Sequence, residues 1–133
     1  MSPTPPSFGY AIVYVESVVD TIAFYEAAFG FTDSFVHEGK DYGELKTGTT
    51  KLAFTAHELA ATAVPFTYTP TTAEARPGVE FTLTTPDVDA SFARATAAGA
   101  TPLAEPTDKP WGQRVAYIAD LNGFAIGIAT PMD

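Results

Sequence analysis

The sequence contains no cysteine, only two histidines, and seven Lys and Arg residues against sixteen Asp and Glu. Without cysteine the chain can form no disulfide, thiolate nucleophile or cysteine-ligated zinc site. Its formal charge of −9 repels phosphate backbones and anionic membranes, so we expect no nucleic-acid and no membrane partner. The same charge favours cationic partners.

Long apolar runs are also missing. No uncharged stretch approaches the roughly 20 apolar residues that span a bilayer, and residues 1–6 carry no positive charge of the kind that begins a secretory leader. We therefore expect a cytoplasmic protein. With 133 residues, 46% of them hydrophobic, the chain suits one compact domain that folds without covalent cross-links.

The first part of the chain predicts one strand, one helix and three further strands. Residues 10–15 form a β-branched and aromatic run typical of a strand. Apolar residues then recur at helical spacing between Ser17, a suitable N-cap, and Gly30, a suitable C-cap. Shorter strands are predicted over residues 32–37, 42–46 and 51–56, with hairpin-like turns between them.

The same order of elements recurs after a connector. Residues 58–78 contain three prolines and little periodicity, which predicts a connector with at most one short extended piece. A strand over residues 79–85 precedes a helix that opens near Asp87 and closes at Gly99. Three more strands are predicted over residues 101–104, 114–119 and 124–129.

This repetition predicts an α+β fold of two tandem βαβββ modules. Gly30 follows Asp20 by ten positions, and Gly99 follows Asp89 by the same spacing. We assign residues 1–133 to a single domain, with module one at about 8–57, the connector at about 58–77 and module two at about 78–130. A half that cannot close its own sheet must bury one face against its twin, which usually creates a cleft.

Three stretches resemble the vicinal oxygen chelate superfamily, which contains glyoxalases, extradiol dioxygenases and bleomycin-resistance proteins. They are residues 18–26 together with 29–31, residues 110–114 and residues 119–124. The last departs from the family's usual Asp-Pro-Asp-Gly by carrying Leu121 and Asn122. The resemblance implies a cup-shaped, mostly antiparallel sheet around a central cavity and, commonly, a homodimer, with the modules packed within one chain or swapped between chains.

The resemblance also implies four positions where catalytic members hold a divalent metal with His, Glu or Gln. Strand alternation and the family pattern place these positions at Tyr10, Ala53, Glu80 and Gly127. Only Glu80 is a good ligand, so we expect no metal and no other cofactor. A ligand borrowed from elsewhere, such as His57, is the alternative.

The predicted binding residues surround this depleted metal site. Glu80 is expected to meet a cationic ligand, to act as a general base, or to pair with Arg114. His57 is expected near the cup rim or at the surface, and Trp111 either faces the cavity or covers the core. Gln113 and Glu44 are candidate polar anchors, and for Glu44 a solvent-facing position is favoured. The full set of predicted ligand-binding residues is Tyr10, Tyr14, Tyr42, Ala53, His57, Glu80, Trp111, Gln113 and Gly127.

We therefore predict a metal-free small-molecule-binding protein that sequesters an aromatic or cationic compound, in the manner of antibiotic-resistance members of the family. The alternative is a metal-dependent enzyme of the glyoxalase, lyase or dioxygenase kind, and a third option is a metal-independent isomerase or lyase with Glu80 as its base. The sequence contains no serine-hydrolase elbow, phosphate-binding glycine loop or dinucleotide fingerprint.

Overall fold

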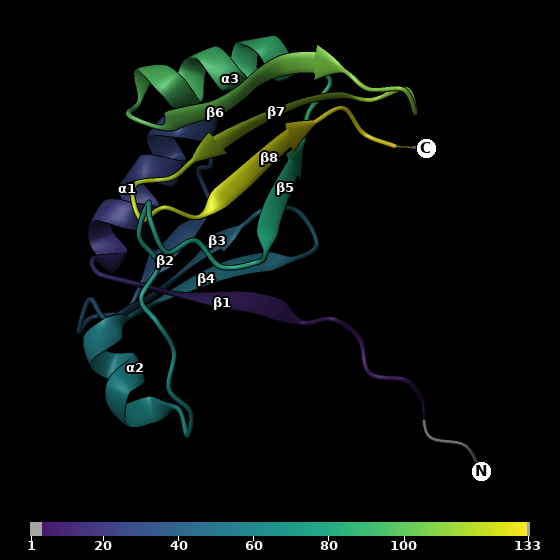
Figure 1. Ribbon diagram of the computed structural model, residues 1–133. Coiled ribbons are helices and arrows are strands. Elements are labelled where there is room, and N and C mark those ends of the chain that lie inside the picture. The colour runs from purple at the N-terminus through teal and green to yellow at the C-terminus, as the bar shows by residue number, and fades with distance from the viewer. Residues whose placement is uncertain (1–3, 133) are drawn as a thin grey trace.

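The chain folds into two βαβββ modules joined by a connector (Figure 1). The structure is a computed structural model that describes residues 4–132. The expectation that residues 1–6 do not begin a secretory leader falls partly on residues 1–3, which lie outside the described residues. Module one comprises β1 (Tyr10–Val15), α1 (Val18–Phe29), β2 (Ser34–Val36), β3 (Tyr42–Lys46) and β4 (Lys51–Ala56). The connector contains α2 (His57–Ala63), and module two comprises β5 (Glu80–Thr84), α3 (Val88–Ala97), β6 (Thr101–Asp108), β7 (Arg114–Ala119) and β8 (Ala125–Ala129). The predicted α+β fold class is confirmed.

The strands of each module form a separate four-stranded mixed sheet. Sheet A has the order β1-β4-β3-β2, and sheet B has the order β5-β8-β7-β6. In each sheet the first and last strands of the module pair in parallel, β1 with β4 and β5 with β8, while the other neighbours are antiparallel. The cup predicted as one sheet is thus built from two sheets.

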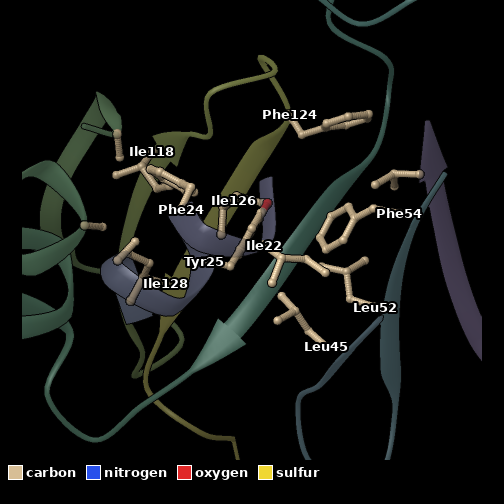
Figure 2. Close-up of a cluster of buried hydrophobic side chains, with 14 of the residues drawn as sticks. Ile22, Phe24, Tyr25, Leu45, Leu52, Phe54, Ile118, Phe124, Ile126 and Ile128 are labelled. Carbon is tan, nitrogen blue, oxygen red and sulfur yellow. The ribbon is translucent and has the colours of Figure 1, made fainter. Parts of the chain in front are cut away.

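A single hydrophobic core joins the modules, and α1 lies between the two sheets (Figure 2). Ile22 and Tyr25 of α1 share this core with Leu52 and Phe54 of sheet A and with Ile126 and Ile128 of sheet B. Because neighbouring side chains of a strand point to opposite faces, each sheet turns one face to this core and the other away from it. We call the face that points away the open face of the sheet.

The two long helices begin and end where their capping residues allow. The Ser17 Oγ accepts a hydrogen bond of 3.2 Å from the Asp20 amide, and the Asp87 carboxylate accepts one of 3.0 Å from the Ala90 amide. Gly30 ends α1 with a φ of 79°, a left-handed conformation that glycine adopts without strain. The predicted caps Ser17, Gly30 and Asp87 are confirmed, whereas α3 ends at Ala97 with Ala98 as its C-cap, one residue before the predicted Gly99.

Two elements differ from the predictions. Residues 57–63 form α2 rather than an irregular or extended connector, because this segment holds mainly alanine, leucine and glutamate, which favour helices. Strand β6 continues to Asp108 instead of ending at Ala104, with irregular register between Pro102 and Thr107. Prolines in β6 remove backbone donors and obscure the strand pattern. No helix within residues 4–132 has the length and apolar character needed to cross a bilayer.

Candidate ligand-binding site

The open face of sheet A presents aromatic and apolar side chains to solvent. Its central row runs across the strands in the order Phe35, Glu44, Ala53 and Ile12. Because the Ala53 side chain is only a methyl group, the surface of sheet A is depressed between Glu44 and Ile12. Phe35 is 53% exposed and Ile12 is 41% exposed. Exposed large apolar side chains on one sheet face are typical of a binding face.

Glu44 places a carboxylate in the middle of this face. Its Oε2 accepts a hydrogen bond of 2.8 Å from the Tyr42 hydroxyl, and its Oε1 lies 3.4 Å from the Lys51 Nζ. The Tyr42 hydrogen bond, followed by Lys51, lowers the pKa of Glu44, while burial and the same bond raise the pKa of Tyr42 to about 12. Glu44 is therefore an anion among aromatic rings at neutral pH, not only a solvent-facing residue.

A cavity of about 420 Å³ lies between β1, β5 and the connector. Most of its lining is aromatic or aliphatic, and the aromatic side chains are Phe8, Tyr10, Tyr14, Tyr68, Phe81 and Phe124. The ring of Tyr68 lies 4.7 Å from that of Tyr14, so the connector folds back over β1. Two of the predicted binding residues, Tyr10 and Tyr14, thus line one cavity.

On sheet B, Glu80 and Gly127 lie together. The Glu80 Oε2 is 2.8 Å from the point where a Cβ of residue 127 would stand, and it accepts a hydrogen bond of 2.9 Å from the Thr82 hydroxyl. The absence of a side chain at Gly127 therefore makes room for the Glu80 carboxylate. Glu80 is exposed on the open face of sheet B, Gly127 is buried beside its carboxylate, and neither lines the cavity of Tyr10 and Tyr14.

The prediction that Glu80 forms an ion pair with Arg114 is wrong, because Arg114 pairs with Asp89 and Asp108 instead. The Arg114 Nε and Nη2 donate to the Asp89 carboxylate at 2.8 and 2.9 Å, and its Nη1 donates to Asp108 at 3.1 Å. Those hydrogen bonds lower the pKa of Asp89. The strand register explains the difference, because Glu80 lies opposite Ala125, which faces Ala119 at the other end of β7 from Arg114.

Trp111 and Gln113 lie together, away from the aromatic cavity. The Trp111 Nε1 donates to the Gln113 Oε1 at 2.7 Å, and the Gln113 Nε2 donates to the Thr130 carbonyl at 2.7 Å. Trp111 is 63% exposed, so it does not cover the core. Since these two residues bind each other and the end of sheet B, they do not contribute to the cavity at β1.

His57 lies at the first position of α2, not on a continuation of β4. Its Nδ1 is 2.7 Å from the Tyr68 hydroxyl, and burial raises the pKa of Tyr68. Through this contact His57 positions the connector ring that covers Tyr14. Strand β4 ends at Ala56, so His57 is on a helix and not on the strand that carries Ala53 and Thr55.

The four positions that the resemblance assigns to a metal do not fit one. Ala53 and Gly127 supply no side-chain donor atom, and the Tyr10 phenol borders an apolar cavity while the Glu80 carboxylate lies on the other sheet. Within residues 4–132, no group of three or more His, Asp or Glu side chains is placed to hold an ion. We therefore derive no step of the function through a metal.

Comparison with known proteins identifies the relatives of this architecture. Residues 7–128 match the model of the Glyoxalase/Bleomycin resistance protein/Dioxygenase superfamily. Similar solved structures include a glyoxalase-related enzyme from Fulvimarina pelagi (18% identity, 94% of this chain and 88% of that one, TM-score 0.82). A glyoxalase/bleomycin resistance protein/dioxygenase from Nocardioides (18%, 99% and 87%, 0.70) and a family enzyme from Burkholderia phytofirmans (24%, 93% and 98%, 0.66) are also similar. No protein among the curated ones matches.

Proposed function

Because the chain belongs to the glyoxalase/bleomycin resistance protein/dioxygenase superfamily, we propose that it binds a planar aromatic cation without a metal ion and sequesters it. The observation that carries this proposal is the aromatic cavity of about 420 Å³ between β1, β5 and the connector. Its volume lies within the usual range of small-molecule pockets, and aromatic walls favour a flat ligand.

Charge supports a cationic ligand. Glu44 places an ionised carboxylate on the same open face as Tyr10 and Tyr14, and the whole chain carries a net charge of −9. Such a field raises the local concentration of cations, and phenol rings attract them through their faces. Sequestration in the cytoplasm would need only this binding, with no reacting group.

We further propose that the binding protein is a homodimer. The four positions discussed above are divided between two sheets whose open faces point away from the shared core. Sheet A also exposes Tyr10, Ile12 and Phe35, which a second copy would cover. In this arrangement sheet A of one copy faces sheet B of the other, and the cup is completed between chains.

Calorimetric titration with proflavine, a planar tricyclic cation, tests the binding proposal. We expect saturable binding that excess EDTA leaves unchanged, because no metal takes part. Tyr14→Ala and Tyr68→Ala should each weaken binding about tenfold, since each removes a stacking wall. Val19→Ala, which truncates a 43% exposed side chain on α1, is the control and should leave the affinity unchanged.

A second comparison tests the role of charge. Glu44→Gln keeps an acceptor for the Tyr42 hydroxyl but removes the negative charge. It should weaken proflavine binding several-fold and leave the binding of acridine, the uncharged analogue at about pH 8, unaltered. Heat that appears only with added zinc, manganese or iron, or equal affinity in the Tyr14→Ala variant, contradicts the proposal and favours a metal-dependent enzyme.

A further inference from the structure

A second cavity, of about 720 Å³, lies at the junction of the two modules. It is bordered by Glu16 after β1, by His57 at the start of α2, by the connector from Pro70 to Arg76, and by the turn between β7 and β8. Among residues 4–132, Thr71 is the one residue that it shares with the aromatic cavity. It is therefore a separate site, and what it binds does not depend on the function proposed above.

The walls of this cavity are held by specific contacts. The Arg76 Nε donates a hydrogen bond of 3.0 Å to the Gly123 carbonyl, which ties the connector to module two. Just before it, the Thr72 hydroxyl accepts a hydrogen bond of 3.0 Å from the Ala75 amide. A Cβ at Gly123 would lie 2.6 Å from the backbone carbon of Thr72, so the connector is seated directly on the turn. The shape of the site is therefore built into the backbone.

Arg76 is a cation without an acidic partner at this site. It is half-buried, and within residues 4–132 no carboxylate oxygen lies within 4.0 Å of it. Its Nε is used by Gly123, which leaves Nη1 and Nη2 for a ligand. Arg114, by contrast, is paired with two aspartates. A half-buried guanidinium with a free pair of donors is suited to an oxyanion bound by two parallel hydrogen bonds.

The remaining lining defines the class of anion. His57 and the hydroxyls of Thr71, Thr72 and Thr101 add donors, whereas Glu16 and Asp120 add acidic groups. The Glu16 carboxylate in this lining repels a doubly charged phosphate more strongly than a singly charged carboxylate. We propose that this junction cavity binds the carboxylate group of a small molecule, with Arg76 as its anchor.

Titration of the ¹⁵N-labelled full chain with sodium acetate, followed by NMR at constant ionic strength, tests this proposal. We expect saturable shifts at the Gly123 amide and the Arg76 Nε–H, and weaker binding of inorganic phosphate. Arg76→Gln should weaken acetate binding about tenfold, because it removes a charge-assisted pair of hydrogen bonds.

Arg94→Gln is the matched control. The Arg94 Nε donates a hydrogen bond of 3.0 Å to the Ala27 carbonyl, so this arginine also links the modules, but it does not line the cavity. Its replacement should leave acetate binding within about twofold. If Arg76→Gln does not fold, Arg76→Lys is the second variant. It keeps the positive charge but cannot donate two parallel hydrogen bonds, so acetate should bind about threefold more weakly. Unsaturable shifts, tighter binding of phosphate, or equal affinity in the Arg76 variants overturns the proposal.

Discussion

Asp120 is a buried carboxylate of module two that links the two modules through hydrogen bonds to residues far away in the sequence. Its Oδ2 accepts a hydrogen bond of 2.6 Å from the Tyr25 hydroxyl of α1, 95 positions away. Its Oδ1 accepts the amides of Asn122 and Phe124 at 2.9 and 3.0 Å. The Asn122 side chain in turn donates to the Thr21 hydroxyl at 3.0 Å. The turn between β7 and β8 is thereby attached to α1.

The burial of Asp120 predicts an unusual pH dependence. Burial raises the pKa of this carboxyl above its ordinary value of about 3.9, although its hydrogen bonds oppose the shift. The fold therefore favours the neutral acid, and this contribution to stability is lost as pH rises through the folded-state pKa. Asp120→Asn stays neutral at every pH. The unfolding free energy of the wild type minus that of Asp120→Asn should fall as pH rises above about 4 in urea titrations. A difference that is flat or rises with pH contradicts this account.

We expect alanine to lower the free energy of unfolding much more at Gly123 than at Gly127. Gly123 has a φ of 100° and would place a Cβ against the rigid backbone of Thr72, so Gly123→Ala should cost about 2 kcal/mol or more. At Gly127 the added Cβ meets only the side-chain atoms of Glu80 and Thr82, which lie on an exposed face and can turn away. Gly127→Ala should cost less than about 1 kcal/mol in the same urea titration. Equal losses would show that Glu80 is held more rigidly than its exposure suggests.

At the scale of elements, α1 packs against sheet A and against α3, and its side chains share the hydrophobic core with β7 and β8 of sheet B. Its N-cap is consequently a test of the whole core. Ser17→Ala removes the acceptor for the Asp20 amide and should lower the unfolding free energy by about 1 kcal/mol. Ser7→Ala, at an exposed position before β1, is the control for urea denaturation and should have no effect. A neutral Ser17→Ala would mean that packing alone sets the start of α1.

Most elements could be predicted because their signals are local. The alternation of apolar and polar residues identifies β1 and β5. Capping residues next to α1 and α3 mark where these helices begin and end. Helix α2 was missed because seven residues followed by a proline-rich segment give little periodicity. The division into two sheets depends on strand pairing, which is not a local property.

The candidate site was predictable to a lesser extent for the same reason. Strand alternation identifies Tyr10 and Tyr14 as open-face residues, and both line the aromatic cavity. Glu44 was underestimated because its role arises from the register that sets it opposite Ala53 and beside Tyr42. The second wall, Tyr68, comes from a connector that folds back over β1, and no local pattern in the sequence indicates such a return.

At the scale of the whole molecule, one core serves both modules, and this leaves each open face without an internal partner. A chain whose sheets enclosed their own cup would bury the residues that sheet A here exposes. The aromatic cavity and the junction cavity both lie where the connector meets the modules, so the connector shapes both proposed sites.

The proposed homodimer makes the last prediction, and light scattering after size exclusion measures it. The wild type should elute with twice the 14.1 kDa mass of the chain. Ile12→Lys places a charge in the middle of the open face of sheet A, where the partner copy would bury it without a counter-ion, so this variant should elute as a monomer at micromolar concentration. Val19→Lys adds the same charge at an exposed position on α1 and should remain dimeric. A wild type that is monomeric at every concentration, or equal behaviour of the two variants, would mean that sheet A is covered by the ligand or the connector instead of by a second copy.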